Sequence, residues 1–555
     1  MEKADIPHRC GAVLTLFTLL LGIGVLHSKT LDVQPTVLFS QSTTRVEAYD
    51  FVEVTLRVKS ALANNPFADV VVQGQFRQEG TAPISVDGFS DSADGTVYRI
   101  RFMPAKPGKY EYSLNYRRGG FSEPHVGTFE AKAAKRRGIL RVDKDYPWHF
   151  IWEGTGEHYF FNGTTAYLLM GWQDERVIRD SIDRLHRLKV NRMRVLLGGG
   201  RSASFWGEPI IPTTKFRPYL NPWVAVRPDD LSHPGFDYTR FNIAHWQKFE
   251  RMLRHARERD MIISVVFDWN DSPVHPTADS EDERRYFRYG AARLSAFSNV
   301  TWDLGDDISS YRSLAWSHQM GTVLSQWDPY RHLATEHPVD NQHQDRTAEW
   351  FSFTSFQQWP RPLHQWMLDQ RRAQAKTGRI IPQTNEEYGY EDHYPKGSTS
   401  YPDGASADAN RRAAWEMAMA GTYQTTGETA KRGTGVWPDT GGGWVNGRGD
   451  STMVMLEGYA HMVEFFTSFE WWKADPHDEL VDHGAFCLAE PGRVYAVYLP
   501  KGGDVAVKLG TGRYPASWFN PRTGKTTPLP AADGPVWTSP KAPDSGDWAL
   551  LLRKT

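Results

Sequence analysis

The segment "NIAHWQKFERMLRHARERD" (residues 242–260) runs without a break into "MIISVVFDW" (residues 261–269). In the first part apolar residues return every three or four positions, which predicts an amphipathic helix, whereas the second is a short apolar run typical of a buried strand. Another strand-like run, "NRMRVLL" (residues 191–197), stands before the helix. Strand, helix and strand in this order predict a parallel sheet.

The same alternation extends through the centre of the chain. The strand-like "HYFFNGTTAYLLM" (158–170) precedes the helical "DERVIRDSIDRLHRLKV" (174–190). Five further strand candidates follow: "NVTWDLGDD" (299–307), "RHLATEHP" (331–338), "WFSFTSFQQW" (350–359), "RIIPQTNEEYGYE" (379–391) and "AGTYQTTGE" (420–428). Eight strand and helix units in roughly 290 residues predict an α/β fold, a (β/α)8 TIM barrel, whose chemistry lies at the carboxyl ends of its strands.

Both ends of the chain have a different pattern. Runs such as "YDFVEVTLRV" near the N-terminus and "RVYAVYLP" near the C-terminus alternate apolar and polar residues and are broken by Gly, Pro and Asn. This pattern is typical of small antiparallel β-sandwiches. We therefore expect an N-terminal β-sandwich at residues 30–135, the catalytic barrel at 145–475 and a C-terminal β-sandwich at 480–555.

The first 28 residues have the layout of a signal peptide. Lys3 and Arg9 precede an apolar run from Ala12 to Leu26, which ends in small and polar residues near Ser28. The run is short against the ~20 residues of a membrane-spanning helix, and an uncleaved anchor is the alternative. We expect an exported protein from which residues 1–28 are removed.

The amino-acid composition limits which classes of binding partner are expected. Of 555 residues 64 are Lys or Arg and 66 are Asp or Glu, a net charge of -2 at pH 7. Such a balance favours neither nucleic acid nor, once the signal peptide is cleaved, an anionic membrane as partner. With Cys10 inside the signal segment, Cys487 is alone, so the sequence predicts no internal disulfide and no Cys/His metal cluster. The oligomeric state stays open.

The fourth and seventh predicted strands each end in adjacent acids. If side chains alternate along strand four, Thr301, Asp303, Gly305 and Asp307 face the barrel interior, and Asp306 falls in the other register unless the chain bends after Gly305. The same rule on strand seven places four residues inward: Ile381, Gln383, Asn385 and Glu387. Glu387 is therefore preferred over Glu386.

Two carboxylates on opposite sides of a barrel mouth suit glycoside hydrolysis. One acid, kept protonated, donates to the leaving oxygen, and the other, ionised, attacks the anomeric carbon. The alternative is that each acid only caps the N-terminus of the next helix. The paired acids in consistent registers, with Arg and Asn beside them, favour catalysis.

The motifs also resemble a known family. "WDLGDD" (302–307) resembles the W-x-x-G-N/G-E/D ending of strand four in clan A glycoside hydrolases, and "NEEYGYED" (385–392) resembles the E-x-x-Y-E ending of strand seven in the apiosidase-like barrels of glycoside hydrolase family 140. The order of domains is similar too, with "FFNGTTAYLL" opening the barrel and "WFNPRTGK" in a C-terminal sandwich of the collagen-binding type.

The resemblance implies roles for individual residues. It places the acid/base on Asp307 and the nucleophile on Glu387, in a retaining, two-carboxylate double displacement. Asp306 stands where clan A enzymes have the Asn or Gly next to the acid/base, so a contact to the sugar's 2-hydroxyl falls to Asp306, and the identity of the sugar stays open. The implied protein is a bacterial glycoside hydrolase, secreted or periplasmic, acting on a plant or algal poly- or oligosaccharide.

Further residues are candidates for substrate binding. Arg194 could orient the nucleophile, or it could pair with Asp303 inside the barrel. The remaining candidates are Asp268, Asn270, His337, Asn385, Tyr390 and Trp444. His337 could also be a surface loop residue, and Trp444 could close over the barrel core instead of offering its indole to a sugar.

Other classes of function would require different residues. A metal-dependent hydrolase would need His ligands at strand ends, but no H-x-H and no H-E-x-x-H occurs, so we expect neither a metal nor any other cofactor. A non-catalytic carbohydrate-binding or adhesion protein on a glycosidase-like barrel is the main alternative. It would keep the aromatic residues but would not require two acids. The residues expected of a lyase cannot be picked out.

Overall fold

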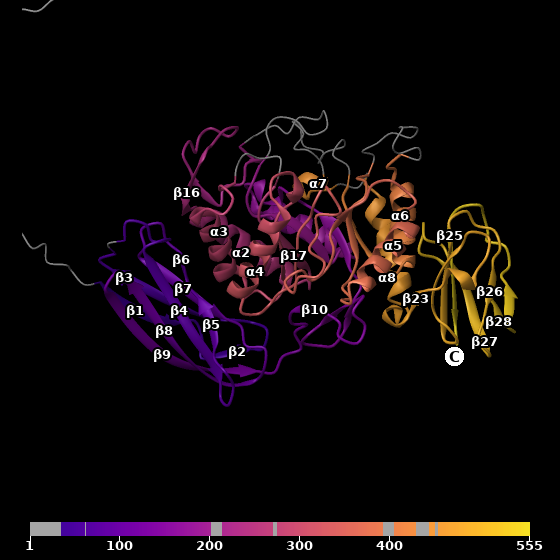
Figure 1. Ribbon diagram of the computed structural model, residues 1–555, viewed down its shortest axis with the longest axis horizontal. Helices are drawn as coiled ribbons and strands as arrows, with labels where there is room; N and C mark the ends of the chain where they lie inside the picture. Colours follow the sequence, from indigo (N-terminus) through magenta and orange to yellow (C-terminus); the bar gives the residue numbers. More distant parts are fainter. Residues whose placement is uncertain are drawn as a thin grey trace, which may run out of the picture.

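The computed structural model describes residues 35–61, 63–200, 214–269, 275–391, 404–428, 443–449 and 453–554. The expected signal peptide (1–28) and Asn270 lie outside these ranges. A β-sandwich, a central barrel and a second β domain follow one another along the long axis of the molecule (Figure 1). In the described part of the chain, no helix is long and apolar enough to span a bilayer.

The central domain is an eight-stranded parallel barrel, as predicted. Its strands lie in the order β19-β18-β17-β14-β13-β22-β21-β20. A parallel bridge between Ala334 and Phe351 joins the two ends of the sheet. The strands are β13 (Asn162–Thr165), β14 (Arg192–Leu196), β17 (Ile262–Val266), β18 (Val300–Asp303), β19 (Ala334–Thr335), β20 (Phe356–Gln357), β21 (Thr384–Glu387) and β22 (Tyr423–Thr426).

Helices cover the outside of the barrel (Figure 1). They are α1 (Glu175–Arg187), α2 (Ile243–Arg257), α3 (Glu281–Leu294), α4 (Leu314–Trp327), α5 (Leu363–Lys376), α6 (Ala407–Met419), α7 (Gly443–Asn446) and α8 (Met455–Phe466). Polar residues fix where several begin: the side chains of Asp174, Ser280, Ser313 and Ser406 each accept a hydrogen bond from a first-turn N–H. In α1, buried Ile178, Ile182 and Leu185 form the face that packs inward.

Short elements connect these units. Strands β10 (Leu140–Val142), β11 (Phe150–Trp152) and β12 (His158–Tyr159) form a small antiparallel sheet just before β13, and β15 (Trp223–Ala225) pairs with β16 (Phe236–Phe241). The 3-10 helices are η1 (Leu169–Gly171), η2 (Ile308–Ser310), η3 (Trp471–Lys473) and η4 (Asp478–Leu480).

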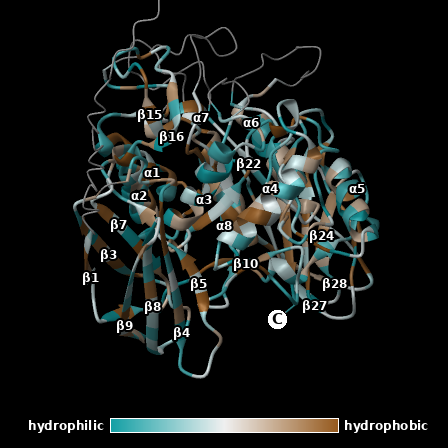
Figure 2. Ribbon diagram, turned by 60° about the vertical axis from the view of Figure 1, so that its left-hand side comes forward, coloured by the Kyte–Doolittle hydropathy of each residue, from teal (hydrophilic) through white to brown (hydrophobic). Residues whose placement is uncertain are grey.

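The N-terminal domain is a sandwich of two sheets. Its strands are β1 (Thr36–Gln41), β2 (Arg45–Glu47), β3 (Val52–Lys59), β4 (Val70–Gln78), β5 (Ile84–Asp87), β6 (Phe89–Ser90), β7 (Val97–Phe102), β8 (Gly108–Arg118) and β9 (Phe121–Lys132). The sheets have the orders β1-β3-β7-β6 and β2-β9-β8-β4-β5. Buried apolar residues alternate with exposed residues along them, as the hydropathy colours of Figure 2 show.

The C-terminal β domain packs against the barrel at α6. Its strands are β23 (Asp475–Pro476), β24 (Phe486–Glu490), β25 (Val494–Leu499), β26 (Ala506–Lys508), β27 (Arg513–Phe519), β28 (Thr526–Asp533), β29 (Val536–Thr538) and β30 (Trp548–Arg553). Trp415 of α6 stacks on Tyr498 of β25, with ring centroids 5.2 Å apart. Arg411 of α6 pairs with buried Asp547.

A buried ion network joins the N-terminal sandwich to the barrel. Arg101 of β7 donates two hydrogen bonds of 2.9 Å to the carboxylate of Glu250 in α2 and a third to the main-chain oxygen of Arg293 in α3. Arg293 in turn pairs with Glu250 and with Asp91 of the sandwich. These charges are withdrawn from water, so each depends on its partners across the boundary between the domains.

Arg101→Met should destabilise the protein by about 3–5 kcal/mol, because it leaves Glu250 buried with an incomplete set of partners. Arg77→Met is the matched control, since the Arg77–Glu111 pair of the same domain is more than half exposed and should cost less than about 1 kcal/mol. Urea unfolding followed by circular dichroism measures both. Equal losses would show that the network contributes no more than a surface pair.

Candidate active site

Arg194 organises the carboxyl end of the barrel. This fully buried residue of β14 donates to Oδ2 of Asp303 at 3.0 Å and to Oδ1 of Asp306 at 2.9 Å. The Tyr167 hydroxyl, which follows β13, accepts from Arg194 and donates to the same oxygen of Asp306, each at 2.9 Å. Of the two roles considered for Arg194, the structure shows the pairing with Asp303 and extends it to Asp306.

Beyond β18 the chain bends, which is the alternative given for Asp306 in place of simple alternation. Strand β18 ends at Asp303, and the next residues turn: the N–H of Asp306 donates to the carbonyl of Asp268, and the N–H of His337 donates to that of Gly305. Asp307 has φ 51° and ψ 31°, the left-handed conformation. Because residues alternate between faces only in extended chain, the turn brings Asp306 into the barrel. Asp307 is half-buried where η2 begins.

A bulge changes the register of β21 in a similar way. Phe356 of β20 lies opposite Asn385, and Gln357 lies opposite Glu387, so Glu386 is the extra residue between them. Two successive glutamates can therefore both point into the barrel. The expected inward position of Glu387 is found, but the strict alternation that set Glu386 outside is wrong.

Asn385 does not join the acids. Its side chain accepts from the Gln358 N–H at 3.1 Å and donates to the Gln358 carbonyl at 3.0 Å. Both ends of the amide are therefore satisfied by the main chain that follows β20. Asn385 is fully buried and contacts the main chain after β20 in place of the acids.

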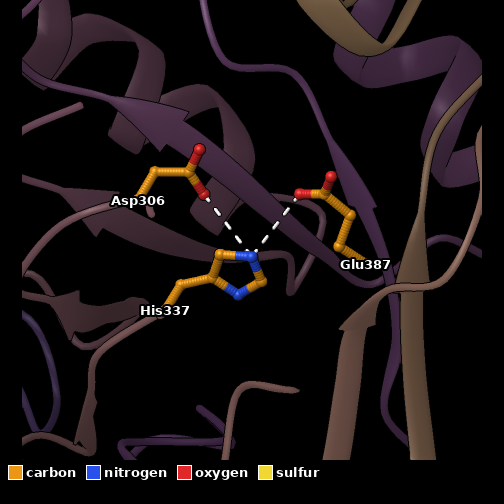
Figure 3. Close-up of side chains that lie close together, drawn as sticks. All are labelled: Asp306, His337 and Glu387. Atoms are coloured by element: carbon orange, nitrogen blue, oxygen red, sulfur yellow. Dashed lines mark ion pairs between the residues drawn. The ribbon is translucent and has the colours of Figure 1, made fainter. Parts of the chain in front are cut away.

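Asp306, His337 and Glu387 meet in one cluster (Figure 3). Nε2 of His337 lies 3.4 Å from Oε2 of Glu387 and 3.8 Å from Oδ1 of Asp306. The facing oxygens of the two carboxyl groups are within 4.8 Å of each other. His337 is fully buried, which excludes the surface-loop position considered for it.

The surroundings of Glu387 favour its ionised form. Burial alone would raise the pKa of this carboxyl, but the hydrogen bond and charge of His337, the charge of Arg194 and the Gln357 amide together hold it below the usual value. The amide of Gln357 donates to Oε1 at 2.9 Å. Around neutral pH Glu387 is thus a carboxylate, the state that a nucleophile needs.

Further acids sit deeper in the barrel. Glu386 is fully buried; burial would raise its pKa, but Arg192, Arg194 and the Ser355 hydroxyl outweigh burial and lower it. Burial raises the pKa of Asp303 to about 6, although Arg194 opposes the shift. Glu386 has two arginines and a hydroxyl to stabilise its charge, whereas Asp303 has Arg194 against the repulsion of Glu386 and Asp306, so the pKa values of the two acids shift in opposite directions.

Aromatic rings line the barrel beside the acids. Tyr390 stacks on Trp444 with ring centroids 4.0 Å apart and planes 9° from parallel, and Tyr167 stacks on Trp269 at 5.5 Å. The rings of Tyr167 and Trp444 then meet edge to face at 6.1 Å. Trp444 is 1% exposed, so it closes over the barrel, as the alternative interpretation had it.

Asp268 serves the site through its main chain. Its carbonyl accepts the Asp306 N–H, but its buried side-chain oxygens have no hydrogen-bond partner among the residues that the structure describes. Burial raises the pKa of Asp268 to about 8, opposed by Arg312. Burial raises the pKa of the Tyr286 and Tyr311 hydroxyls, and the negative charge of Asp268 raises both further.

The cluster of Asp306, His337 and Glu387 has a spacing that could gather a metal ion. Oδ1 of Asp306, the oxygen nearest to His337, already accepts hydrogen bonds from Arg194 and Tyr167. A cation bound there would lie next to a guanidinium, so the donor set does not fit a metal.

Several residues of this site were not predicted from the sequence. Tyr167, Gln357 and Ser355 each contact one of the acids or His337. They follow or occupy predicted strands, so their position at a carboxyl strand end was the available signal.

Comparison with known proteins agrees with this architecture. Residues 220–428 match the model "Apiosidase-like, catalytic domain", residues 45–117 match "Domain of unknown function (DUF5060)", and residues 479–553 match "Putative collagen-binding domain of a collagenase". The first range includes Asp306, Asp307, His337 and Glu387. No curated protein matches the chain.

Solved structures share the fold. A "putative glycoside hydrolase" from Bacteroides vulgatus has a TM-score of 0.75 at 19% identity, covering 92% of this chain and all of its own. A glycoside hydrolase family 5 protein from the same species has a TM-score of 0.58 at 17% identity, covering 75% and 93%.

These findings define the fold as a TIM barrel with a β domain on each side, shared with proteins described as glycoside hydrolases. The barrel matches an apiosidase-like catalytic domain, and the C-terminal domain matches a putative collagen-binding domain. The resemblance stated from "WDLGDD" and "NEEYGYED" is confirmed. Fold and family matches together support a glycosidase.

Replacing Asp268 tests its protonation. A raised pKa in the folded protein gives stability that is present below pH 4 and is lost as the pH rises to about 8. Asp268→Asn cannot ionise, so relative to the parent protein it should gain stability over this range. The gain at pH 7 should be on the order of 2–4 kcal/mol, since one pKa unit corresponds to about 1.4 kcal/mol.

Denaturant unfolding at pH 5, 7 and 8 measures the gain, with Asp180→Asn on the exposed face of α1 as the control. The control should show no such trend. A difference between Asp268→Asn and the parent protein that is constant across these pH values would mean that Asp268 is already ionised in the folded state.

Proposed function

We propose that the protein is a retaining glycoside hydrolase in which Glu387 is the nucleophile and Asp307 is the acid/base. The observation that carries the proposal is the convergence at one barrel mouth of Glu387, held ionised by His337 and Arg194, with Asp306, the residue next to Asp307. The facing oxygens of Asp306 and Glu387 are within 4.8 Å of each other, which supports a close approach of the chain after β18 to Glu387. For retention, the carboxyl groups of Asp307 and Glu387 must come about 5–5.5 Å apart, whereas inverting enzymes use wider spacings.

The two acids after β18 suit different tasks. Asp306 already accepts hydrogen bonds from Arg194 and Tyr167, so its carboxylate is engaged as an acceptor. A general acid must carry a proton and exchange it, and Asp307, which is less buried than Asp306, is assigned this task. Asp306 can accept a hydrogen bond from the sugar's 2-hydroxyl, a contact that strengthens in the transition state.

The reaction then proceeds in two steps. Asp307 gives its proton to the glycosidic oxygen while a carboxylate oxygen of Glu387 bonds to the anomeric carbon and the aglycone leaves. Asp307, now a carboxylate, takes a proton from water, whose oxygen attacks the anomeric carbon and releases Glu387. The product keeps the anomeric configuration of the substrate.

We also propose where the protein acts and on which class of substrate. The N-terminal layout of residues 1–28 favours export, to the exterior or the periplasm of a bacterium. The apiosidase-like match supports a carbohydrate substrate, and we propose a plant or algal poly- or oligosaccharide. A non-catalytic carbohydrate-binding protein is the alternative, but it would have no use for a buried, ionised glutamate at the mouth.

A panel of plant and algal polysaccharides and aryl glycosides should yield at least one substrate. Glu387→Gln, which keeps the shape of the side chain but cannot form the glycosyl-enzyme, should lose at least about a thousandfold in rate. Proton NMR during the first turnovers should show the product anomer of the same configuration as the substrate. The opposite anomer formed first would mean inversion, and binding without turnover by the parent protein would support the non-catalytic alternative.

Azide should separate Asp307 from Asp306. In Asp307→Ala, turnover should fall most for substrates with poor leaving groups, and azide should restore it on activated substrates because azide attacks the glycosyl-enzyme without a base. In Asp306→Ala, binding and rate should both weaken, with no azide rescue and no dependence on the leaving group. Rescue of Asp306→Ala alone would exchange the two roles.

A further inference from the structure

Ser355 lies between a buried carboxylate and the histidine of the site. This residue stands just before β20, and its hydroxyl donates to Oε2 of Glu386 at 2.6 Å. Its oxygen is also 2.9 Å from Nδ1 of His337. Glu386, Ser355 and His337 thus form a continuous chain of side chains, fully buried at each member.

The direction of these hydrogen bonds can be worked out. Glu386 is paired with Arg192 and is ionised, so it can only accept. A serine hydroxyl has one proton, and that proton is directed to Glu386. The Ser355 oxygen must then accept from His337, which places a proton on Nδ1 of the imidazole ring.

The second ring nitrogen is the one that faces the reacting groups. With Nδ1 directed to Ser355, Nε2 points at Oε2 of Glu387 and Oδ1 of Asp306 (Figure 3). A ring with its single proton on Nδ1 would present a lone pair to these two carboxylates, so a contact that favours the ionised Glu387 requires a second proton on Nε2, which gives the ring its charge. The main chain of His337 is held as well: its N–H donates to Gly305, and its carbonyl accepts from Ile308. A flip of the ring would need the hydrogen bond to Ser355 to break.

We propose that Glu386 and Ser355 are positioning residues, which fix the proton on Nδ1 of His337 and so hold its Nε2 edge against Glu387 and Asp306. This inference rests on the proposed function of Glu387 as the nucleophile. Glu386 therefore has the role of orienting His337, which is distinct from the role of Glu387. The bulge in β21 is what allows one glutamate to reach the sugar while the next orients the ring beside it.

The ion pair between Glu386 and Arg192 does not by itself explain why Ser355 also contacts His337. Glu386 receives two hydroxyl donors, Ser355 on Oε2 and Thr425 on Oε1 at 3.0 Å. Only Ser355 has a second contact to His337. The two hydroxyls thus give a matched comparison: each satisfies the same buried carboxylate, and one of them leads on to the site.

Ser355→Ala should lower kcat/KM on an aryl glycoside by on the order of ten- to a hundredfold, mainly through kcat, because a released ring misplaces a group beside the nucleophile. Thr425→Val should stay within about threefold of the parent protein. The acid limb of the kcat/KM profile should also move to higher pH in Ser355→Ala only, since Glu387 loses a group that keeps it ionised.

Nitrogen-15 NMR of histidine-labelled protein provides a readout that needs no substrate. The His337 signals, identified by their absence in His337→Phe, should show a proton fixed on Nδ1 in the parent protein and in Thr425→Val, but not in Ser355→Ala. If Ser355→Ala does not fold, Ser355→Gly takes its place, and the parent spectrum alone still decides the tautomer.

The outcomes separate this inference from the proposed function. A protonated Nδ1 that depends on Ser355, in a protein without glycosidase activity, would uphold the relay and reject the function. Activity with equal effects of Ser355→Ala and Thr425→Val, or an unprotonated Nδ1 of His337 in the parent protein, would overturn the relay.

Discussion

The contact on which the site depends is the fork of Arg194 between Asp303 and Asp306. One guanidinium, buried on β14, binds an acid inside β18 and a second acid three residues beyond the end of that strand. The first contact ties β14 to β18 across the intervening strand β17, inside the barrel. The second holds Asp306 in place although it lies beyond the strand.

The other polar groups of the site contact Arg194 or the acids around it. Tyr167 bridges Arg194 and Asp306, and it also lies 3.5 Å from Glu387. His337 joins the same two acids from the opposite side. Buried charges of this kind are tolerated only when each has partners. The contacts that position the proposed site are therefore the same contacts that satisfy the buried charges of the barrel interior.

The sequence predicted the architecture because the architecture depends on periodicity. Eight apolar runs with helices between them are enough to specify a barrel, and the strand ends then indicate the mouth. Alternation also placed Asp303 correctly, since it lies in regular paired strand, and Glu387 faces the site as expected. It failed at Glu386, the extra residue of the bulge, and at Asp306 a turn replaces extended chain. Such departures depend on contacts from other strands, which a local pattern does not contain.

The same departures explain how adjacent acids can serve one pocket. In a regular strand two neighbouring carboxylates face opposite sides, and only one could reach a sugar. The left-handed conformation of Asp307 interrupts the pleat and costs on the order of 1 kcal/mol, although aspartate tolerates it better than most residues. Gly305 makes the turn possible, since a Cβ at this position would lie only 2.3 Å from the hydroxyl of Tyr311. The glycine and the left-handed aspartate on one strand, and the bulge on the other, thus free both acid pairs from the two-residue period that the rest of the barrel obeys.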